Sequence, residues 1–147
     1  MSDDTFRSVD IERTSVGQYV VSNVRGGSIS IGTGDDDSFT PVELLLAALG
    51  GCAAVDVDLI TSRRAEPSEF LVKVTGDKVR DEAGGNRMKH LSVQFTVTFP
   101  DGEAGDAARD TLPRSLKMSH DRLCTVSRTV EIGTPVSITI APSMNST

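Results

Sequence analysis

Hydrophobic and polar positions alternate most clearly over residues 91–99. The apolar residues of this segment are Leu91, Val93, Phe95, Val97 and Phe99, and the residues between them are Ser, Gln and Thr. A period of two is typical of a strand with one buried face. Alternating or β-branched segments predict further strands over residues 9–13, 18–25, 28–31, 69–79 and 134–140.

A helix start follows the third predicted strand. Thr40, Pro41 and Glu43 have the spacing of a capping box with proline at the first helical position. The helix is predicted to run to about residue 64, because Pro67 lies just beyond and stops it.

This predicted helix is apolar on nearly every face over residues 44–55. Such a helix is expected to be buried all round. At this length it crosses a domain of 147 residues completely. Gly50 and Gly51 in its middle indicate that another backbone comes close there.

The remaining pattern completes the fold class. A weaker helical pattern covers residues 104–120, which Pro113 is expected to break, and residues 124–129 suit a short helical turn. Strands, a long helix, strands, a helix and a strand predict an α+β fold with a mainly antiparallel sheet. No linker or repeat interrupts it, so we expect a single domain over residues 1–147.

Composition narrows the class of protein. The net charge of −6 argues against a nucleic-acid partner, because such proteins show a basic face. The start of the chain lacks the pattern of a signal peptide, and the apolar run of residues 44–55 is too short to span a bilayer. We therefore expect a cytoplasmic protein without a membrane partner, in which Cys52 and Cys124 are free, catalytic or metal-bound rather than a permanent disulfide.

The two cysteines are the first candidates for chemistry, and each has two interpretations. Cys52 lies between Gly50-Gly51 and two alanines, where it is either a core residue or a thiol with space around it. Cys124 begins the short helical turn between Arg122 and Arg128, so it is either a surface cysteine or a thiol with a lowered pKa.

Arg13 and Glu43 are the charged candidates. Arg13 is in phase with Val9 and Ile11, so its guanidinium either points inward to an anionic partner or reaches water at the strand end. Glu43 already has a structural task in the capping box.

A metal site is a weak alternative. His90 and His120 with the two cysteines would supply zinc ligands, but structural zinc sites usually bring ligands in close pairs. We expect no metal and no bound cofactor.

Two motifs resemble those of one family. Residues 40–52, TPVELLLAALGGC, resemble the central helix of the OsmC/Ohr proteins (osmotically inducible and organic hydroperoxide resistance proteins), and residues 124–128, CTVSR, resemble their second-cysteine motif. The resemblance, nearer to the OsmC-like branch, implies an OsmC-like fold. In that fold an antiparallel sheet packs on a long buried central helix, and two chains form an intertwined homodimer.

The resemblance also implies an activity. Family members reduce organic hydroperoxides with two cysteines, so Cys52 would be the peroxidatic thiolate and Cys124 the resolving thiol. Arg13 would hold the thiolate together with Glu43, with Arg25 as the fallback arginine. An external, lipoyl-type dithiol would be the reductant, and apolar neighbours of Cys52 would favour alkyl or lipid hydroperoxides.

One position departs from the hydroperoxide-resistance branch. Its glutamate directly follows the proline, where this chain has Val42, and the acid comes one residue later at Glu43. One residue is about 100° around a helix. The alternative is therefore a non-enzymatic binding or redox-sensing module with an apolar pocket at the dimer interface. A third interpretation makes both cysteines inert core residues.

Overall fold

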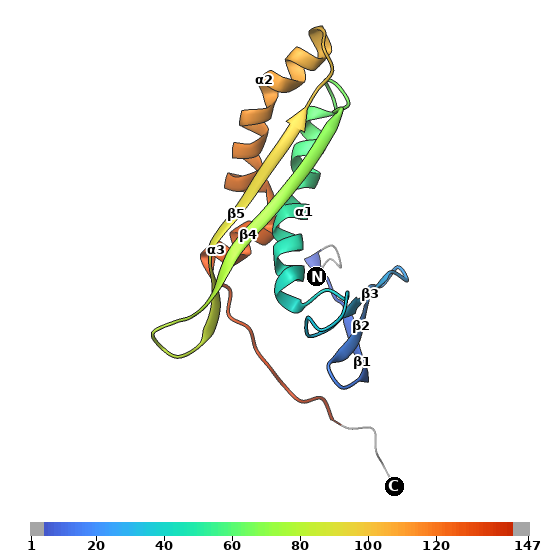
Figure 1. Ribbon diagram of the computed structural model, residues 1–147, viewed down its shortest axis with the longest axis vertical. Helices are drawn as coiled ribbons and strands as arrows, with labels where there is room; N and C mark the ends of the chain where they lie inside the picture. Colours follow the sequence, from blue (N-terminus) through green and yellow to red (C-terminus); the bar gives the residue numbers. More distant parts are fainter. Residues whose placement is uncertain (1–4, 143–147) are drawn as a thin grey trace. The chain divides into compact units, whose positions relative to one another are not determined.

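The computed structural model describes residues 5–142 (Figure 1). The described chain forms two compact units, residues 5–51 with 72–95 and residues 52–71 with 96–142. Helix α1 (Pro41–Thr61) and strands β4 (Glu69–Arg80) and β5 (Asn86–Thr98) each contribute to both units. The prediction of one domain over residues 1–147 stays a prediction.

The first unit contains an antiparallel sheet in the order β1-β2-β3. Its strands are β1 (Asp10–Ser15), β2 (Gln18–Ser22) and β3 (Ser28–Ile31), which confirms the three strands predicted there. The turn between β2 and β3 forms because Asn23 Oδ1 accepts the N–H groups of Arg25 and Gly27 at 2.9 and 3.0 Å. Gly26 takes φ +91°, a conformation that favours glycine.

Helix α1 begins as predicted. The Thr40 N–H donates to Glu43 Oε1 at 2.9 Å, and the Glu43 N–H donates to Thr40 Oγ1 at 3.2 Å, which is the reciprocal pair of a capping box. The helix ends at Thr61 rather than near residue 64. The Arg64 N–H bonds to the Thr61 carbonyl at 3.0 Å, so the last residues form a tighter turn than the helix.

The expectation that α1 is buried all round is wrong for the single chain. Leu49 and Val57 are buried at 5% and 0% exposure, but Val55 and Leu59 are 59% and 60% exposed. Together with Ala48 and Gly51, Val55 and Leu59 form one exposed helical stripe, spaced three or four residues apart. An apolar sequence predicts burial without saying which chain provides it.

The two glycines of α1 differ. A Cβ on Gly50 would lie 2.4 Å from Val74 Cγ2, so side chains of β4, rather than the predicted backbone, approach the helix closely there. A Cβ on Gly51 would meet nothing within 4 Å, and the predicted close approach is wrong at that position. Gly51 instead lies on the exposed stripe of α1.

By length and composition, α1 would also be sufficient to cross a membrane. Its 21 residues include an 18-residue window with a mean hydropathy of 1.8. This window is longer than the apolar run of residues 44–55, which is too short to span a bilayer. A core helix passes the same test, so this feature is weak evidence for a span.

The strands β4 and β5 form a two-stranded hairpin. Half-buried and exposed residues alternate over most of both strands, which confirms the alternation predicted over residues 91–99. The hairpin turns at residues 81–85, where the Asp81 N–H bonds to the Gly85 carbonyl at 2.7 Å and Asp81 Oδ1 accepts the Gly85 N–H.

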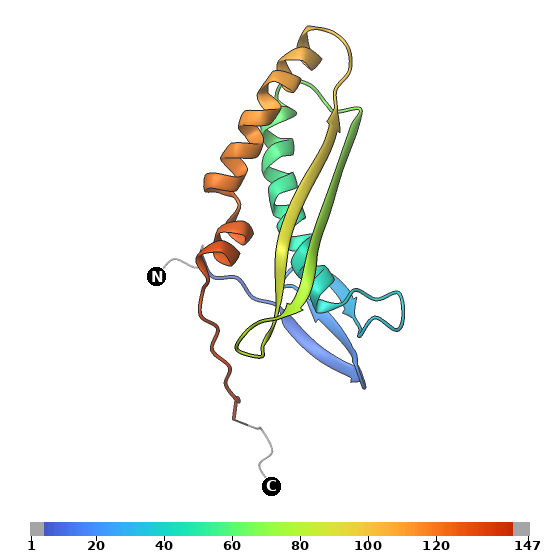
Figure 2. The same ribbon diagram turned by 60° about the vertical axis from the view of Figure 1, so that its left-hand side comes forward.

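In the second unit, α2 (Glu103–Met118) continues through Pro113, and the predicted break is wrong. Its buried residues Gly105, Ala108, Thr111 and Ser115 share one face, whereas Pro113 is exposed. The carbonyl that loses its N–H partner at the proline therefore lies on the solvent side, and packing of the buried face keeps the helix intact. Figures 1 and 2 show α2 beside the second half of α1.

A π-helical turn, η2 (Ser119–Leu123), follows α2 and leads into α3 (Thr125–Ile132). The predicted helical turn over residues 124–129 is thus a full helix that begins one residue later. Single π turns occur mostly as bulges at functional sites.

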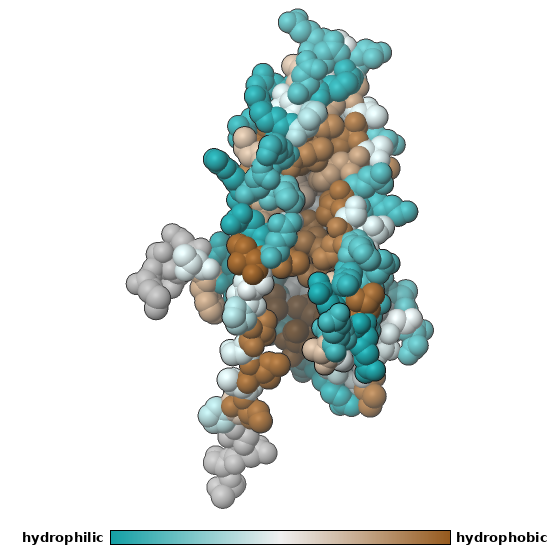
Figure 3. Space-filling view, turned by 90° about the vertical axis from the view of Figure 1, so that its left-hand side faces the viewer, coloured by the Kyte–Doolittle hydropathy of each residue, from teal (hydrophilic) through white to brown (hydrophobic). Residues whose placement is uncertain are grey.

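The predicted strand over residues 134–140 is wrong for the described chain, in which this segment has no regular structure. Val136, Ile138 and Ile140 are 85%, 93% and 97% exposed. Brown side chains stand out along the segment at the bottom of Figure 3. The alternation is real, but a strand also needs a neighbouring strand to satisfy its backbone hydrogen bonds.

Candidate active site

The two cysteines meet in the second unit. Cys52 lies on α1 and is half-buried, while Cys124 is completely buried. Cys124 is the N-cap residue of α3 with extended backbone angles (φ −74°, ψ 97°), and its Sγ accepts the Ser127 N–H at 3.4 Å. A sulfur therefore occupies the position at which helices usually carry a hydroxyl or carboxylate oxygen.

The first turn of α3 acts on both cysteines. The Ser127 N–H donates to Cys124 Sγ at 3.4 Å. The Val126 N–H acts to lower the pKa of Cys52, and each thiol acts on the pKa of the other. The N-terminus of a helix carries partial positive charge, which stabilises an anion. The fold thus brings together two residues that are 72 positions apart in the sequence.

The two thiols differ in ionisation. Burial raises the pKa of Cys52, and the neighbouring Cys124 and the Asp56 carboxylate raise it further against the opposing Val126 N–H. Burial also acts to raise the pKa of Cys124, but the bonds from Ser127 and Cys52 outweigh it and lower that pKa. The two pKa values therefore move in opposite directions, and Cys124 ionises more readily than Cys52.

Of the two causes that the sequence predicts for a lowered pKa of Cys124, the N–H groups of the helix start are confirmed, and the arginines are not among the causes found. The bonds from Ser127 and Cys52 lower this pKa. Arg128 Nη1 instead donates to the Asp121 carbonyl at 3.3 Å. His120 bonds to Asp121 and to Glu131 Oε1, and these acidic partners raise the pKa of His120.

Asp56 and Ser119 are members of the site that the sequence analysis missed. Ser119 is 1% exposed and its Oγ donates to Asp56 Oδ2 at 2.9 Å, while its carbonyl accepts the Cys124 N–H at 2.8 Å. Asp56 could have been found from its spacing in the sequence, because it lies four residues after Cys52 and so on the same helical face.

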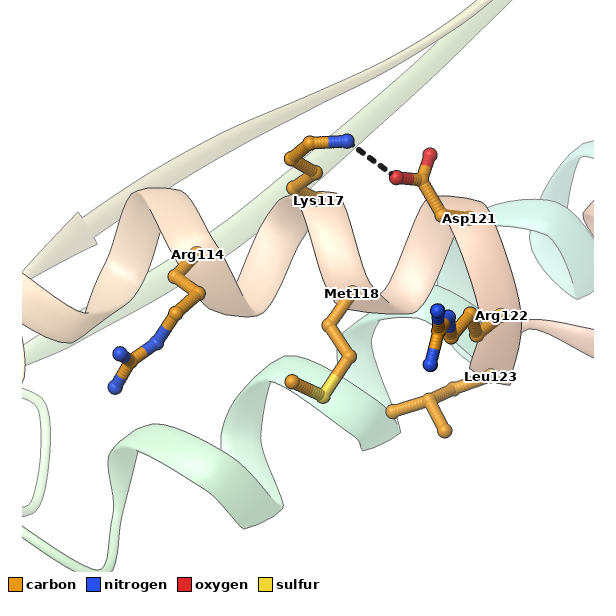
Figure 4. Close-up of a pocket in the computed structure, with 6 residues that line it drawn as sticks. All are labelled: Arg114, Lys117, Met118, Asp121, Arg122 and Leu123. Carbon is orange, nitrogen blue, oxygen red and sulfur yellow. Dashed lines mark hydrogen bonds and ion pairs between the residues drawn. The ribbon is translucent and has the colours of Figure 1, made fainter.

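A groove of about 390 Å³ lies on the outer side of α2 and η2. Its lining residues are Arg114, Lys117, Met118, Asp121, Arg122 and Leu123. Figure 4 shows Met118 and Leu123 on one side of the helical ribbon, and the ion pair of Lys117 and Asp121 on the other. The groove adjoins the site along the chain, because Leu123 directly precedes Cys124.

The other two predicted site residues belong to the first unit. Arg13 is exposed on β1, and the Glu43 carboxylate bonds to Thr40, which lowers its pKa. Between these two described side chains no ion pair forms. The structure confirms the capping role of Glu43, whereas the catalytic roles of Arg13 and Glu43 stay predictions.

No group of three or more His, Cys, Asp or Glu within residues 5–142 has the geometry to hold a metal ion.

The fold and the site define a class of protein. It is an α+β chain with antiparallel strands that brings two free cysteines together at a helix N-terminus. The chain matches the family model described as OsmC-like protein over residues 34–139, and it belongs to that family.

The chain is also similar to two bacterial proteins. The chain is 32% identical over 101 residues to protein YhfA of Escherichia coli K12, covering 68% of this chain and 70% of YhfA. It is 28% identical over 132 residues to an uncharacterized protein of Mycobacterium tuberculosis, covering 88% and 93% of the two chains.

Solved structures confirm the OsmC/Ohr fold. An OsmC-like protein of unknown function from Vibrio cholerae superposes with a TM-score of 0.71 at 13% identity, covering 86% of this chain and 94% of that one. The organic hydroperoxide resistance protein OhrB of Bacillus subtilis superposes with a TM-score of 0.52 at 13% identity, covering 83% and 90%.

Proposed function

We propose that this protein is a thiol-dependent peroxidase that reduces organic hydroperoxides through Cys52 and Cys124. The observation that carries the proposal is the juxtaposition of two free thiols at the N-terminus of α3, where Cys124 Sγ accepts the Ser127 N–H and each thiol acts on the pKa of the other. A buried pair of inert cysteines would not need the N–H donors of α3. Membership of the OsmC-like family and the fold shared with OhrB support the same chemistry.

The proposed cycle begins at Cys52, because its side chain is the more accessible of the two. A proton passes from Cys52 to the neighbouring Cys124, which leaves the thiolate on Cys52. That thiolate attacks the distal oxygen of the hydroperoxide, the O–O bond breaks, and the alkoxide leaves as alcohol after taking a proton. Cys52 is then a sulfenic acid.

The second half of the cycle restores the thiols. The Cys124 sulfur attacks Cys52 Sγ, the S–O bond breaks, and hydroxide leaves as water with the thiol proton. An external dithiol of the lipoyl type then reopens the Cys52–Cys124 disulfide by two exchange steps and becomes a disulfide itself. No bound cofactor enters the cycle.

The apolar part of the groove supports an organic substrate. Met118 and Leu123 offer apolar surface next to Cys124 along the chain, and Arg114 and Arg122 add positive charge at its edge. Such a surface suits an alkyl or lipid hydroperoxide better than hydrogen peroxide.

A homodimer is part of the proposal. The exposed stripe of α1, defined above by Ala48, Gly51, Val55 and Leu59, and the apolar segment 134–140 leave much hydrophobic surface uncovered in one chain. Burial against a second copy would remove this surface from water. Sedimentation is expected to give the mass of two chains, and Val55→Asp is expected to shift the protein to monomer. A wild-type monomer at micromolar concentration would contradict this part.

The decisive test of the activity is steady-state reduction of cumene, lipid and hydrogen peroxides with dihydrolipoamide. Cys52→Ser is expected to abolish turnover, and wild-type protein oxidised by one equivalent of hydroperoxide is expected to lose two hydrogens, mapped to a Cys52–Cys124 disulfide. Dimedone should label Cys52 in Cys124→Ser, because the sulfenic acid then has no resolving partner.

The outcomes separate the alternatives. Dimedone labelling of Cys124 in Cys52→Ser, with none of Cys52 in Cys124→Ser, would reverse the assigned roles. Turnover of none of the three peroxides, with a ligand co-purified, would favour the non-enzymatic binding module, for which the engagement of Glu43 in the capping box is the supporting observation. Two cysteines unchanged by peroxide would mark them as inert.

A further inference from the structure

We propose that Asp56 and Ser119 form a positioning pair that holds the Cys124 turn against α1 and places a carboxylate one helical turn from Cys52. The proposal rests on the proposed function only in treating Cys52 and Cys124 as the reacting groups. Asp56 lies one helical turn after Cys52 on α1, and Ser119 is the first residue of η2, which leads directly to Cys124.

The geometry makes Ser119 a bridge between the elements that carry the two cysteines. Its hydroxyl donates to Asp56 Oδ2 at 2.9 Å, and its carbonyl accepts the Cys124 N–H at 2.8 Å. Ser119 is 1% exposed, so water does not compete freely for either bond. The chain from Asp56 through Ser119 to Cys124 therefore fixes the backbone of the turn relative to α1.

The charge of Asp56 opposes ionisation of the site. Its carboxylate acts to raise the pKa of Cys52 and that of Cys124, because a second negative charge nearby disfavours a thiolate. A carboxylate beside reactive thiols has a use in limiting over-oxidation, since only the thiolate reacts readily with peroxide.

The other charges near the site are engaged elsewhere. Apart from Asp56, the titratable group that acts on each cysteine is the other cysteine. Several charged side chains of α2, η2 and α3 form bonds of their own or line the groove: Lys117 with Asp121, His120 with Asp121 and Glu131, Arg128 with the Asp121 carbonyl, and Arg114 and Arg122 in the groove. Asp58 of α1 is exposed.

The test measures the rate of alkylation of each cysteine by iodoacetamide between pH 5 and 10, read by peptide mass. Asp56→Asn keeps an acceptor for Ser119 but removes the charge. It is expected to move both profiles to lower pH and to raise alkylation at pH 7 by about twofold or more. Asp56→Glu should return the profiles toward those of wild type. Asp58→Asn, a charge change of the same size on the same helix, should leave them unchanged.

The positioning half of the proposal needs a second variant. Ser119→Ala keeps the Asp56 charge but removes its hydroxyl donor. It is expected to slow disulfide formation by diamide about threefold or more, while Asp56→Asn at the same thiolate fraction does not. Should Asp56→Asn fail to fold, Asp56→Ser, which also offers an acceptor without a charge, provides the charge test.

Two results would overturn the inference: superimposable profiles for wild type and Asp56→Asn, or an equal shift in Asp58→Asn. An unchanged diamide rate in Ser119→Ala would remove the positioning role. Alkylation uses no peroxide, so a shifted profile in a protein without peroxidase turnover would overturn the proposed function alone. Turnover by wild type with an unshifted Asp56→Asn profile would overturn this inference alone.

Discussion

The N-termini of α1 and α3 are both capped by side chains, but the capping atoms are oxygens at α1 and a sulfur at α3. Each helix start leaves backbone N–H groups without a partner. At α1, Thr40 and Glu43 satisfy them with a hydroxyl and a carboxylate on the surface; at α3, the buried Cys124 sulfur accepts the Ser127 N–H. Oxygen is the better acceptor, so the sulfur cap gives a weaker bond but adds a group that can ionise and be oxidised.

The difference shows how a capping position becomes a reactive one. The Glu43 carboxylate is ionised throughout the neutral range, and its hydrogen bonds with Thr40 cap the helix. At Cys124 the same type of hydrogen bond lowers the pKa of the thiol, which favours the thiolate. The following variants test whether the α1 cap affects only stability, whereas the α3 cap affects both stability and reactivity.

The largest effect is expected at the α3 cap. Cys124→Ser and Cys124→Ala should both lose hydroperoxide turnover by about 100-fold or more, because neither can form the disulfide. Only Cys124→Ala also lacks a capping acceptor, which costs about 1 kcal/mol of unfolding free energy relative to Cys124→Ser. Turnover assays and urea unfolding of both variants measure the two parts. Equal stability of the two variants would show that the sulfur does not act as a cap.

The next effect is at the α1 cap. Thr40→Ala removes the hydroxyl that accepts the Glu43 N–H and should lower the unfolding free energy by about 1 kcal/mol. Its kcat should equal that of wild type, because the Glu43 carboxylate remains in place after the substitution. Thr40→Ser, which retains the hydroxyl, is the matched control. A kcat reduced tenfold in a folded Thr40→Ala would break the comparison.

A smaller effect is expected from Ser127→Ala. The Ser127 hydroxyl bonds to the Cys124 sulfur and lowers its pKa, while the backbone N–H of the same residue remains after the substitution. The pKa of Cys124 should therefore rise, and its alkylation at pH 7 should slow by about two- to threefold. Ser127→Thr keeps the hydroxyl and should react at the wild-type rate. Faster alkylation in Ser127→Ala would contradict the assigned hydrogen bond.

The smallest effect is the pH dependence of the α1 cap. The bonds from Thr40 lower the pKa of Glu43 in the folded chain, so the stability they contribute is present above the unfolded-state pKa. It is lost as the pH falls through the folded-state pKa. Urea midpoints between pH 6 and pH 3 should fall less steeply in Glu43→Gln than in wild type. An identical slope in the two proteins would remove the carboxylate from the capping box.

Local patterns predicted local structure well. The capping box, the turn at Gly26, the hairpin strands and the start of α3 near Cys124 each depend on a few neighbouring residues, and the structure confirms them. The predicted strand over residues 134–140 was wrong because alternation specifies a face but not a partner. The predicted break at Pro113 was wrong because packing of the opposite face outweighs one lost hydrogen bond.

The sequence by itself determined the α+β class, the capping of α1, the family motifs and the identity of the two candidate thiols. Only the tertiary structure decided that Cys52 and Cys124 lie next to each other, that their pKa values move in opposite directions, and that Asp56 and Ser119 join them. The physical reason is the distance along the chain over which each kind of interaction acts. Capping and alternation act over a few residues, whereas desolvation and Coulomb interactions depend on which distant segments the fold places side by side.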